Sequence, residues 1–402
     1  MKNNRTFLEK LLDGAEVEWK TVKSLCNDNF WLMPATPEFD DNGTIPYITS
    51  KNIKGGKIDF QNTKYINEHV YQELSRTRCI IENDILISMI GTIGEAVIVK
   101  KEDLFFYGQN MYILRLNNKL VNHKFFLYYF TAPFILNSLL SKKNSSNQGY
   151  LKAGQIENLK IPIPPLSVQT EIVKILDALT ALTSELTSEL TLRSKQYEYY
   201  REKLLSFDSL EQLNMGGAKK KLIDVAIYAK VRISANKLNK ENYVGVENLL
   251  QNKLGKTSSN YVPTEGSFIE YLPNDILIGN IRPYLRKIWL ADKTGGTNGD
   301  VLVIRLTDKN ILPRYLYHIL ANEHFFEYNI KYSKGAKMPR GDKAAILQYE
   351  FDVPSLAEQH RIVSILDKFE TLTNSITEGL PLAIEQSQKR YEYYRELLLS
   401  FS

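Results

Sequence analysis

The chain has 402 residues, a net charge of +5, 43% hydrophobic residues and two cysteines. This length predicts two to three domains, and no apolar run is long enough to span a bilayer. The mildly basic charge permits a polyanionic partner without requiring one. The N-terminal residues do not have the pattern of a signal peptide, and Cys26 and Cys79 lack zinc-ligand spacing. We therefore expect a cytoplasmic protein with ordinary thiols and no membrane segment.

The first half begins with a short helical piece and continues as an α/β pattern. Alternating apolar runs separated by turn residues predict strands, and an aromatic stretch of helical period predicts a helix. The helical pieces are 7–12 and 123–130, and the strands are 45–53, 83–90, 95–100 and 111–116.

A long helix is predicted over 169–207, after a prolyl run at 161–165. At about 1.5 Å per residue it would be roughly 58 Å long. Its apolar residues recur at steps of three and four, so they form one seam that a second helix must cover. The seam residues are Ile172, Leu176, Leu179, Leu182, Leu186, Leu190, Tyr197, Tyr200 and Leu204.

The second half repeats the first. The phrases NDIL, E/R-I-V-K/S-ILD and YEYYRE each occur twice. The repeated order comprises strands at 242–249, 274–281, 286–292 and 301–306, a helix at 314–320, and a long helix from 358. Gly379 and Pro381 predict that this helix is broken, with Gly379 closing the first piece and Pro381 opening the second. Ser355 and Glu358 match a capping box.

The predicted fold is α+β: two mixed α/β domains separated by two long antiparallel helices that form a coiled-coil spacer, with an internal pseudo-two-fold duplication. The second helix must run back along the first if the second domain is compact, which also brings the chain termini close together. The predicted segments are a first domain at 1–160, a first helix at 161–207, a second domain at 208–350 and a second helix at 351–402.

The sequence contains no catalytic constellation. It has no phosphate-binding loop and no glycine-rich turn for a dinucleotide or methyl donor. The five histidines have neither metal-ligand spacing nor an acidic partner pattern, so no metal site is expected. Glu16, Glu18 and Lys20 form an E-x-K fragment, but no preceding strand carries the Asp that nuclease chemistry would need.

Four polar, basic segments are candidates for DNA contact, because Lys and Arg neutralise phosphates while Arg, Asn and Gln also match base edges. The alternative is that these loops are simply solvated. The candidates are Lys51, Asn52, Lys54, Lys142, Lys143, Asn147, Gln148, Tyr150 and Lys152 in the first half, and Arg282, Tyr284, Arg286, Lys334, Lys337 and Arg340 in the second. Arg115 and Arg305 recur within strands and are expected to make structural pairs instead.

The tyrosine-rich helix ends have two interpretations that can both hold. As core they belong to the seam; as surface they form paired docking patches for a bound subunit. The residues expected in the spacer and in subunit docking are Leu176, Leu179, Leu186, Leu190, Tyr197, Tyr200, Leu366, Phe369, Leu372, Tyr391 and Tyr394.

The duplicated prolyl stop before each helix, the repeated Y-E-Y-Y-R phrase and FLEKLLDGAEVEW resemble specificity (S) subunits of type I restriction–modification systems. The tandem TSEL at 183–190 resembles the IC subfamily. The resemblance implies two target recognition domains that each read half of a bipartite site in double-stranded DNA. It also implies a helical spacer that binds two methyltransferase (M) subunits and, through them, a restriction/translocase (R) subunit. Methyl donor, ATP and Mg are then expected on those partners, with no cofactor and no catalytic residue on this chain.

Two other classes of function remain as rivals. A stand-alone nuclease or methyltransferase would need the cofactor and metal motifs that the sequence lacks. A coiled-coil scaffold that never touches DNA would not need basic loops in both halves.

Overall fold

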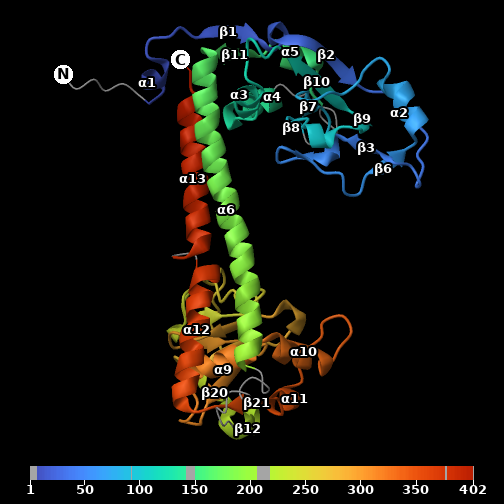
Figure 1. Ribbon diagram of the computed structural model, residues 1–402. Helices are drawn as coiled ribbons and strands as arrows, with labels where there is room; N and C mark the ends of the chain where they lie inside the picture. The colour runs from blue at the N-terminus through green and yellow to red at the C-terminus, as the bar shows by residue number, and fades with distance from the viewer. Residues whose placement is uncertain (1–6, 92, 142–149, 206–217, 376–377, 402) are drawn as a thin grey trace, which may run out of the picture. The chain divides into compact units, whose positions relative to one another are not determined.

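The computed structural model describes residues 7–91, 93–141, 150–205, 218–375 and 378–401. The chain divides into two compact units, one of residues 1–184 with 386–402 and the other of residues 185–385. Each unit contains small sheets, short helices and parts of the long helices (Figure 1), so the fold class is α+β.

The first unit is built on a four-stranded antiparallel sheet of order β2-β10-β7-β8. Its strands are β1 (Glu18–Thr21), β2 (Cys26–Leu32), β3 (Ile45–Thr49), β4 (Ile53–Lys54), β5 (Lys57–Ile58), β6 (Lys64–Ile66), β7 (Ile85–Ser88), β8 (Ala96–Ile98), β9 (Tyr107–Gln109), β10 (Met111–Leu116) and β11 (Lys160–Ile163). Its short helices are α1 (Phe7–Leu12), η1 (Val22–Leu25), η2 (Ser50–Asn52), α2 (Glu68–Ser75), η3 (Lys101–Asp103), α3 (His123–Phe130), α4 (Pro133–Ser141) and α5 (Ala153–Glu157).

The second unit repeats this arrangement, with a four-stranded sheet of order β13-β20-β17-β18. Its strands are β12 (Ala218–Lys221), β13 (Ala226–Tyr228), β14 (Arg232–Ser234), β15 (Tyr243–Val244), β16 (Ser267–Tyr271), β17 (Ile276–Gly279), β18 (Ile288–Leu290), β19 (Gly295–Thr297), β20 (Val301–Leu306) and β21 (Glu350–Val353). Its short helices are α8 (Leu222–Val225), η4 (Ala235–Lys237), η5 (Pro283–Leu285), α9 (Pro313–Leu320), α10 (Glu323–Lys331) and α11 (Lys343–Leu347).

The repeated NDIL phrase makes the same buried ion pair in both units. Asp84 caps the backbone N–H of Ile81 at 2.9 Å and accepts from Arg115 of β10 at 2.9 Å. In the second unit Asp275 caps a backbone N–H in the same way and pairs with Arg305 of β20 at 2.6 Å. Both aspartates are buried. The prediction that the two strand arginines make structural pairs is confirmed.

A buried glutamine fastens the start of each long helix to its domain. The side chain of Gln169 accepts from the N–H of Asn122 at 2.8 Å and donates to the carbonyl of Pro164 at 2.8 Å. Gln359 does the same with Leu312 and Pro354, at 2.9 Å each. Both glutamines are fully buried, so these bonds satisfy backbone groups that water cannot reach.

Replacing Gln359 by leucine is expected to lower the free energy of unfolding of the second unit by about 2–4 kcal/mol, because the Leu312 N–H and its neighbouring carbonyls lose their partner. Urea unfolding of the full chain measures the loss. Gln251→Leu removes an exposed glutamine of the same unit and should change little. Equal effects of the two substitutions would show that the buried bonds do not stabilise the helix start.

The long helices are α6 (Leu166–Leu205), α12 (Leu356–Asn374) and α13 (Leu380–Leu399). The second predicted helix is therefore in two pieces, as expected. The role predicted for Gly379 is wrong: α12 ends with Ser375 as its C-cap, and Gly379, at φ +84°, directly precedes α13. Pro381 lies in the first turn of α13, where its missing N–H is not needed. The Ser355 hydroxyl accepts a hydrogen bond from the N–H of Glu358. The Glu358 side chain accepts from Arg361 and does not complete the predicted capping box.

In the first unit, α13 runs antiparallel to the first half of α6. Thr183 and Ser387 share a hydrogen bond of 2.8 Å near one end, while Leu398 lies in the same core cluster as Ile172 near the other. The α3 aromatics Phe125 and Phe126 belong to that cluster too. The apolar seam therefore packs on the domain as well as on the partner helix. Phe7 contacts Tyr394 with ring centroids 6.5 Å apart, which confirms that the start of the described chain lies near its end.

In the second unit, the second half of α6 packs antiparallel against α12. Tyr197 stacks on Phe369 at 6.1 Å, and Tyr200 stacks on the same ring at 5.6 Å. Leu205 joins the core cluster that contains Ile362 and Leu366. Leu182, in the first unit, departs from the predicted seam: it is 39% exposed.

Candidate nucleic-acid interface

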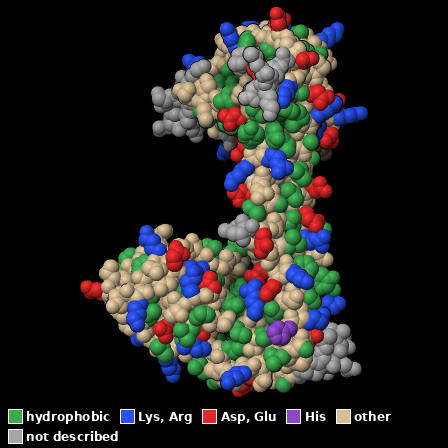
Figure 2. Space-filling view, turned by 90° about the vertical axis from the view of Figure 1, so that its left-hand side faces the viewer, with side chains coloured by type: hydrophobic (Ala, Val, Ile, Leu, Met, Phe, Trp, Pro, Cys, Tyr) green, Lys and Arg blue, Asp and Glu red, His purple; other side chains and the backbone are tan. Residues whose placement is uncertain are grey.

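Charge on the surface is mixed. Figure 2 shows Lys and Arg side chains interspersed with Asp and Glu over the face in view. With a net charge of only +5, a DNA-binding surface has to be local.

The two basic segments predicted in the second half meet at the end of β17. Ile281 and Arg340 form an isolated β-bridge, and the N–H of Arg282 donates to the carbonyl of Pro339 at 2.8 Å. The N–H of Gly341 donates to Asn280 at 3.0 Å. Residues 280–287 and 331–343 therefore form one surface, which we name the β17 loop pair.

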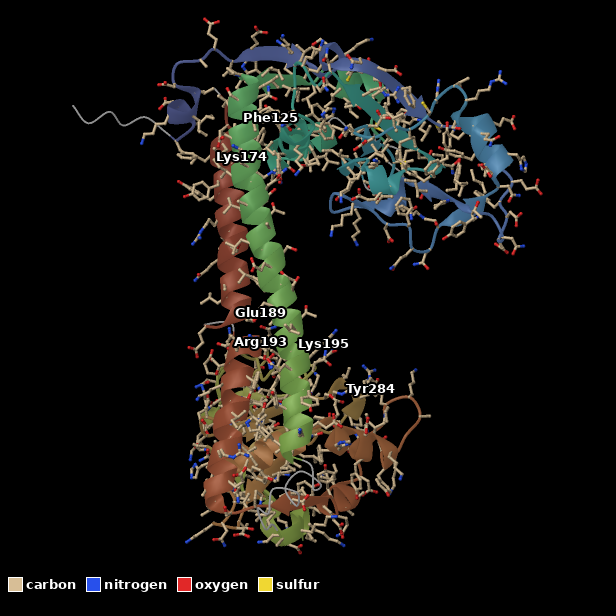
Figure 3. All side chains as sticks on the ribbon, in the orientation of Figure 1. Phe125, Lys174, Glu189, Arg193, Lys195 and Tyr284 are labelled. Atoms are coloured by element: carbon tan, nitrogen blue, oxygen red, sulfur yellow. The ribbon has the colours of Figure 1, made fainter. Side chains whose placement is uncertain are left out.

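The first loop of this pair holds two arginines in the left-handed region. Arg282 and Arg286 flank η5 with φ values of +54° and +50°. That conformation is unfavourable for a residue with a side chain and persists only where the surroundings impose it. Between them Tyr284 is 46% exposed and projects from the second unit (Figure 3). Arg282 is exposed as well.

Arg286 is an anchor of the loop. Its Nε donates to the Glu323 carboxylate at 2.7 Å, and Lys253 joins the same carboxylate at 3.1 Å. Burial alone would raise the pKa of Glu323, but the bonds and charges of these two cations outweigh it and lower the pKa. Arg286 is therefore engaged within the fold, while Arg282 and Tyr284 face solvent.

The second loop is a tight hairpin. Lys334 and Arg340 exchange backbone hydrogen bonds of 2.8 and 2.9 Å. Their side chains form ion pairs as well: Lys334 with Asp342, and Arg340 with Asp300 at 3.2 Å. Lys337 lies exposed between them. The hairpin thus presents Lys337 on a support made by the two paired cations.

The first unit has the matching arrangement. Ile90, which follows β7, forms the same isolated bridge with Tyr150, and the N–H of Leu151 donates to Met89 at 3.1 Å. Tyr150 is 38% exposed, and Lys152 is exposed at the start of α5. Of the other residues predicted in this segment, four lie outside the described residues: Lys142, Lys143, Asn147 and Gln148.

The remaining segment, around η2, contacts β7 and presents Lys51 and Lys54 as exposed side chains. Asn52 is committed to the loop itself, because it accepts from the N–H of Thr49 at 3.0 Å and donates to Asp59 at 2.9 Å. Asn248 makes the equivalent turn bond to Gly245 at 2.8 Å in the second unit. The duplication shows a structural role for this asparagine that one copy alone did not reveal.

The predicted spacer residues differ in burial. Three of them, Leu176, Tyr197 and Leu366, are buried. Seven are half-buried: Leu179, Leu186, Leu190, Phe369, Leu372, Tyr391 and Tyr394. Tyr200 is 37% exposed. All of them therefore contribute to packing, whereas the most exposed helix tyrosines are two that the sequence analysis did not select, Tyr199 and Tyr393.

One histidine has an acidic partner that is distant in the sequence and that no local pattern indicates. His318 of α9 is buried with its Nε2 2.8 Å from the Asp367 carboxylate of α12, and Glu370 lies close enough to complete a possible metal-ligand group. Arg314 already pairs with both carboxylates, at 2.8 and 2.6 Å. A cation would have to displace this guanidinium, so the group carries no metal assignment.

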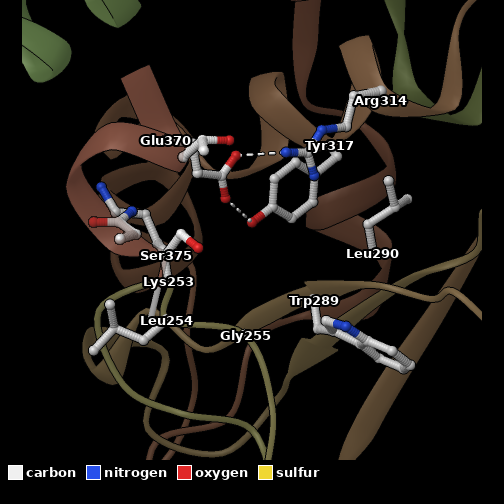
Figure 4. Close-up of a pocket in the computed structure, with 11 residues that line it drawn as sticks. Lys253, Leu254, Gly255, Trp289, Leu290, Arg314, Tyr317, Glu370 and Ser375 are labelled. Atoms are coloured by element: carbon white, nitrogen blue, oxygen red, sulfur yellow. Dashed lines mark hydrogen bonds and ion pairs between the residues drawn. The ribbon is translucent and has the colours of Figure 1, made fainter. Parts of the chain in front are cut away.

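A cavity of about 280 Å³ opens beside this group (Figure 4). Glu370 forms part of its wall, where it binds Arg314 and accepts from the Tyr317 hydroxyl at 3.4 Å. Lys253 and Trp289 also line the cavity. The polar groups on this wall bind one another, as in a structural network.

Burial lowers the pKa of His318, although its hydrogen bond to Asp367 and the charge of Glu370 oppose this shift. The folded chain therefore keeps His318 neutral at pH values where the unfolded chain, with a pKa of about 6.5, takes up a proton. The stability from this group is complete above about pH 6.5 and falls as the pH drops below it. His318→Gln should flatten that fall in urea unfolding at about pH 7 and about pH 5.5. His360→Gln, at an exposed site of the same unit, should leave it unchanged.

Within the part of the chain that the structure describes, none of the helices is long and apolar enough to cross a membrane.

Comparison with known proteins shows which family this duplicated arrangement of domains belongs to. The family model described as "Type I restriction modification DNA specificity domain" matches residues 15–193 and again 216–386. A putative type I restriction enzyme specificity subunit from Haemophilus influenzae is 38% identical over 100% of both chains. The EcoR124I/EcoR124II specificity subunit from Escherichia coli is 33% identical over 98% of this chain and 97% of its own.

The fold agrees with these matches. The crystal structure of a type I restriction–modification S subunit from M. genitalium superposes with a TM-score of 0.55 over 97% of this chain and 98% of its own, at 15% identity. Two matches of the family model along one chain correspond to the two duplicated units. The chain belongs to the type I restriction–modification specificity subunits, with two target recognition domains, no catalytic role and no cofactor of its own.

Proposed function

We propose that each globular domain reads one half of a bipartite double-stranded DNA site, and that the helices set the gap and dock two M subunits. The recognition domains are residues 1–160 and 208–350, and the spacer helices are 161–207 and 351–402. The R subunit joins through the M subunits, and the complex acts in the cytoplasm. The tandem TSEL further assigns the chain to the IC subfamily.

One observation carries this proposal: the same bridge recurs in both domains. Ile90 with Tyr150, and Ile281 with Arg340, hold a polar segment against the end of equivalent strands. In the second domain the result is a surface with Arg282, Tyr284 and Lys337 exposed. Arginine can read a base edge bidentately, tyrosine can bind phosphate, and lysine neutralises it. The target bases depend on loop geometry and DNA shape, for which no residue code exists.

Alanine at Arg282 is expected to weaken DNA binding by the assembled complex by about 1–3 kcal/mol if it reads a base, with relaxed specificity at one position. Alanine at Lys337 should weaken all sequences alike and reduce the salt slope by about 1. Binding titrations on cognate and scrambled duplexes at several salt concentrations distinguish the two.

Two further variants serve as controls. The end of β17 pairs with the start of β20, whereas Lys309 is an exposed residue that follows the end of β20. Lys309→Ala should therefore bind DNA normally. Arg286→Ala should lower the melting temperature as well as the affinity, because Glu323 loses an ion-pair partner. Wild-type affinity and salt slope in both Arg282→Ala and Lys337→Ala would remove the β17 loop pair from the DNA surface.

A further inference from the structure

A buried polar site lies at the base of the β17 loop pair. Asn280, the residue after β17, is 5% exposed, and Asn329 of α10 is 1% exposed. Within the described residues, the side-chain oxygen of Asn280 and both amide atoms of Asn329 have no hydrogen-bond partner. A polar group that is buried without a partner costs free energy, so each such group in a folded protein needs an explanation.

The two asparagine side chains converge on Gly341, in the second loop of the pair. A Cβ atom at residue 341 would lie 2.4 Å from the Asn329 oxygen and 2.9 Å from the Asn280 oxygen, closer than real contacts allow. The N–H of Gly341 also donates to the Asn280 carbonyl at 3.0 Å. The amides therefore take the space in which a side chain of residue 341 would begin, and we name these three residues the amide site.

The first unit has an apolar cluster at the equivalent positions. The equivalence follows from the NDIL phrase, from the seventh position of the nine-residue helices α4 and α10, and from the two isolated bridges. The three apolar residues are buried in one core cluster. The backbone bond from the third residue to the first is present in both units, at 3.1 and 3.0 Å. The fold therefore does not require amides here. The corresponding pairs are Asn280/Met89, Asn329/Leu139 and Gly341/Leu151.

The loop pair is the adjustable side of the amide site. Arg282, two residues after Asn280, has a φ of +54°, which is unfavourable for a residue with a side chain. Asn329 belongs instead to α10, which is packed into the core of the second unit through Phe325 and Phe326. When the amides gain hydrogen-bond partners, the loops have to move and the helix stays in place.

We propose that Asn329 is a specificity-determining positioning residue of the second recognition domain: the amide site gains partners in the loop backbone only when the β17 loop pair settles on the correct half-site. This inference rests on the proposed function, in which that loop pair reads DNA. A wrong base keeps the loops out of this arrangement, so the buried amides stay unpaired and binding is weaker. The apolar cluster of the first domain has no amide to satisfy, so its loop needs no such adjustment.

The test measures DNA binding by the full chain assembled with its M subunits, on duplexes with one base pair substituted in one half-site at a time. The wild-type complex should bind a substituted duplex about tenfold more weakly than the correct one. Asn329→Leu should reduce this discrimination to about twofold in the half-site of the second domain, mainly by weakening binding to the correct duplex. Discrimination in the other half-site should not change. Exchange of residues 208–350 identifies which half-site belongs to the second domain.

Three further measurements show that the effect is one of positioning. The melting temperature of Asn329→Leu should equal or exceed that of the wild type, because an apolar side chain replaces an unpaired buried amide. The triple variant Asn280→Met, Asn329→Leu and Gly341→Leu copies the apolar cluster of the first unit and should lose discrimination in the same half-site. Leu139→Met, a volume-conserving change at the position equivalent to Asn329, should alter neither half-site.

Wild-type discrimination by both Asn329→Leu and the triple variant would overturn the inference. An equal loss of discrimination in the two half-sites would overturn it as well, and so would a lower melting temperature of Asn329→Leu, since the amide would then serve the fold. A wild-type complex that discriminates in neither half-site would instead contradict the proposed function.

Discussion

One extra TSEL unit after residue 190 is expected to widen the gap in the recognised DNA site by one or two base pairs. The existing repeat lies within α6, which is continuous from Leu166 to Leu205. Four more residues lengthen a helix by about 6 Å and turn its far end by roughly 40° beyond a full turn. Neighbouring base pairs are about 3.4 Å apart and turned by roughly 35°. The added rotation of the helix is close to the rotation between two neighbouring base pairs. The added length is closer to the rise over two base-pair steps.

The half-sites themselves should not change, because neither recognition domain is altered. The insertion keeps the helical periodicity, since four residues form a tolerated stutter in a coiled coil. Mapping methylated adenines in cells that carry the three-repeat variant and its M subunit reads the gap directly. A matched variant with four residues inserted after Gly299, which is part of the second domain, should not widen the gap. An unchanged gap in the three-repeat variant would show that α6 does not set the spacing.

Removal of the Asp275 carboxylate is expected to lower the free energy of unfolding of the second unit substantially. Asp275→Ala leaves Arg305 without its partner and the N–H of Leu272 without its cap. Breaking a buried pair costs about 3–5 kcal/mol; because the Arg305 side chain is 23% exposed, we expect about 3 kcal/mol. At about 2–4 °C per kcal/mol for a unit of this size, the melting temperature should fall by about 6–12 °C.

A double-mutant cycle separates the pair from its surroundings. Arg305→Met alone leaves Asp275 buried without its guanidinium, whereas the double variant Asp275→Ala with Arg305→Met removes both charges. The double variant should lose less stability than the sum of the single variants, since no buried charge is left uncompensated. Strict additivity in thermal unfolding would contradict a coupled pair. The same cycle at Asp84 and Arg115 should behave alike, because the first unit repeats the geometry.

The regular parts of the fold could be predicted from periodicity and from the internal repeat. The alternation of apolar residues at 111–116 and 301–306 correctly predicted β10 and β20. The apolar seam without glycine or proline correctly predicted α6. Gly379 and Pro381 marked the break between α12 and α13, although α12 already ends at Asn374, where the N–H of the C-cap Ser375 donates to the carbonyl of Thr371. Repetition also identified the strand arginines as structural, since two copies of one pair imply a shared role in the fold.

Contacts between residues distant in sequence could not be predicted. His318 meets Asp367 only because α9 packs against α12, and no spacing in the sequence encodes that distance. Likewise Arg286 looked equivalent to Arg282 as a loop cation, yet Glu323 binds only the former. The two most exposed tyrosines of the long helices could not be predicted for a related reason. Periodicity selects the buried face, while Tyr199 and Tyr393 lie on the other.

The most direct test of the account exchanges one recognition domain. Residues 208–350 are replaced by the corresponding segment of the Haemophilus influenzae relative, which aligns along the whole chain. Methylated adenines are then mapped in cells that express the hybrid with the M subunit. We predict a bipartite motif in which one half-site changes, while the other half-site and the gap stay as in the wild type. A change in both half-sites, or in neither, would contradict the claim that each domain reads its own half.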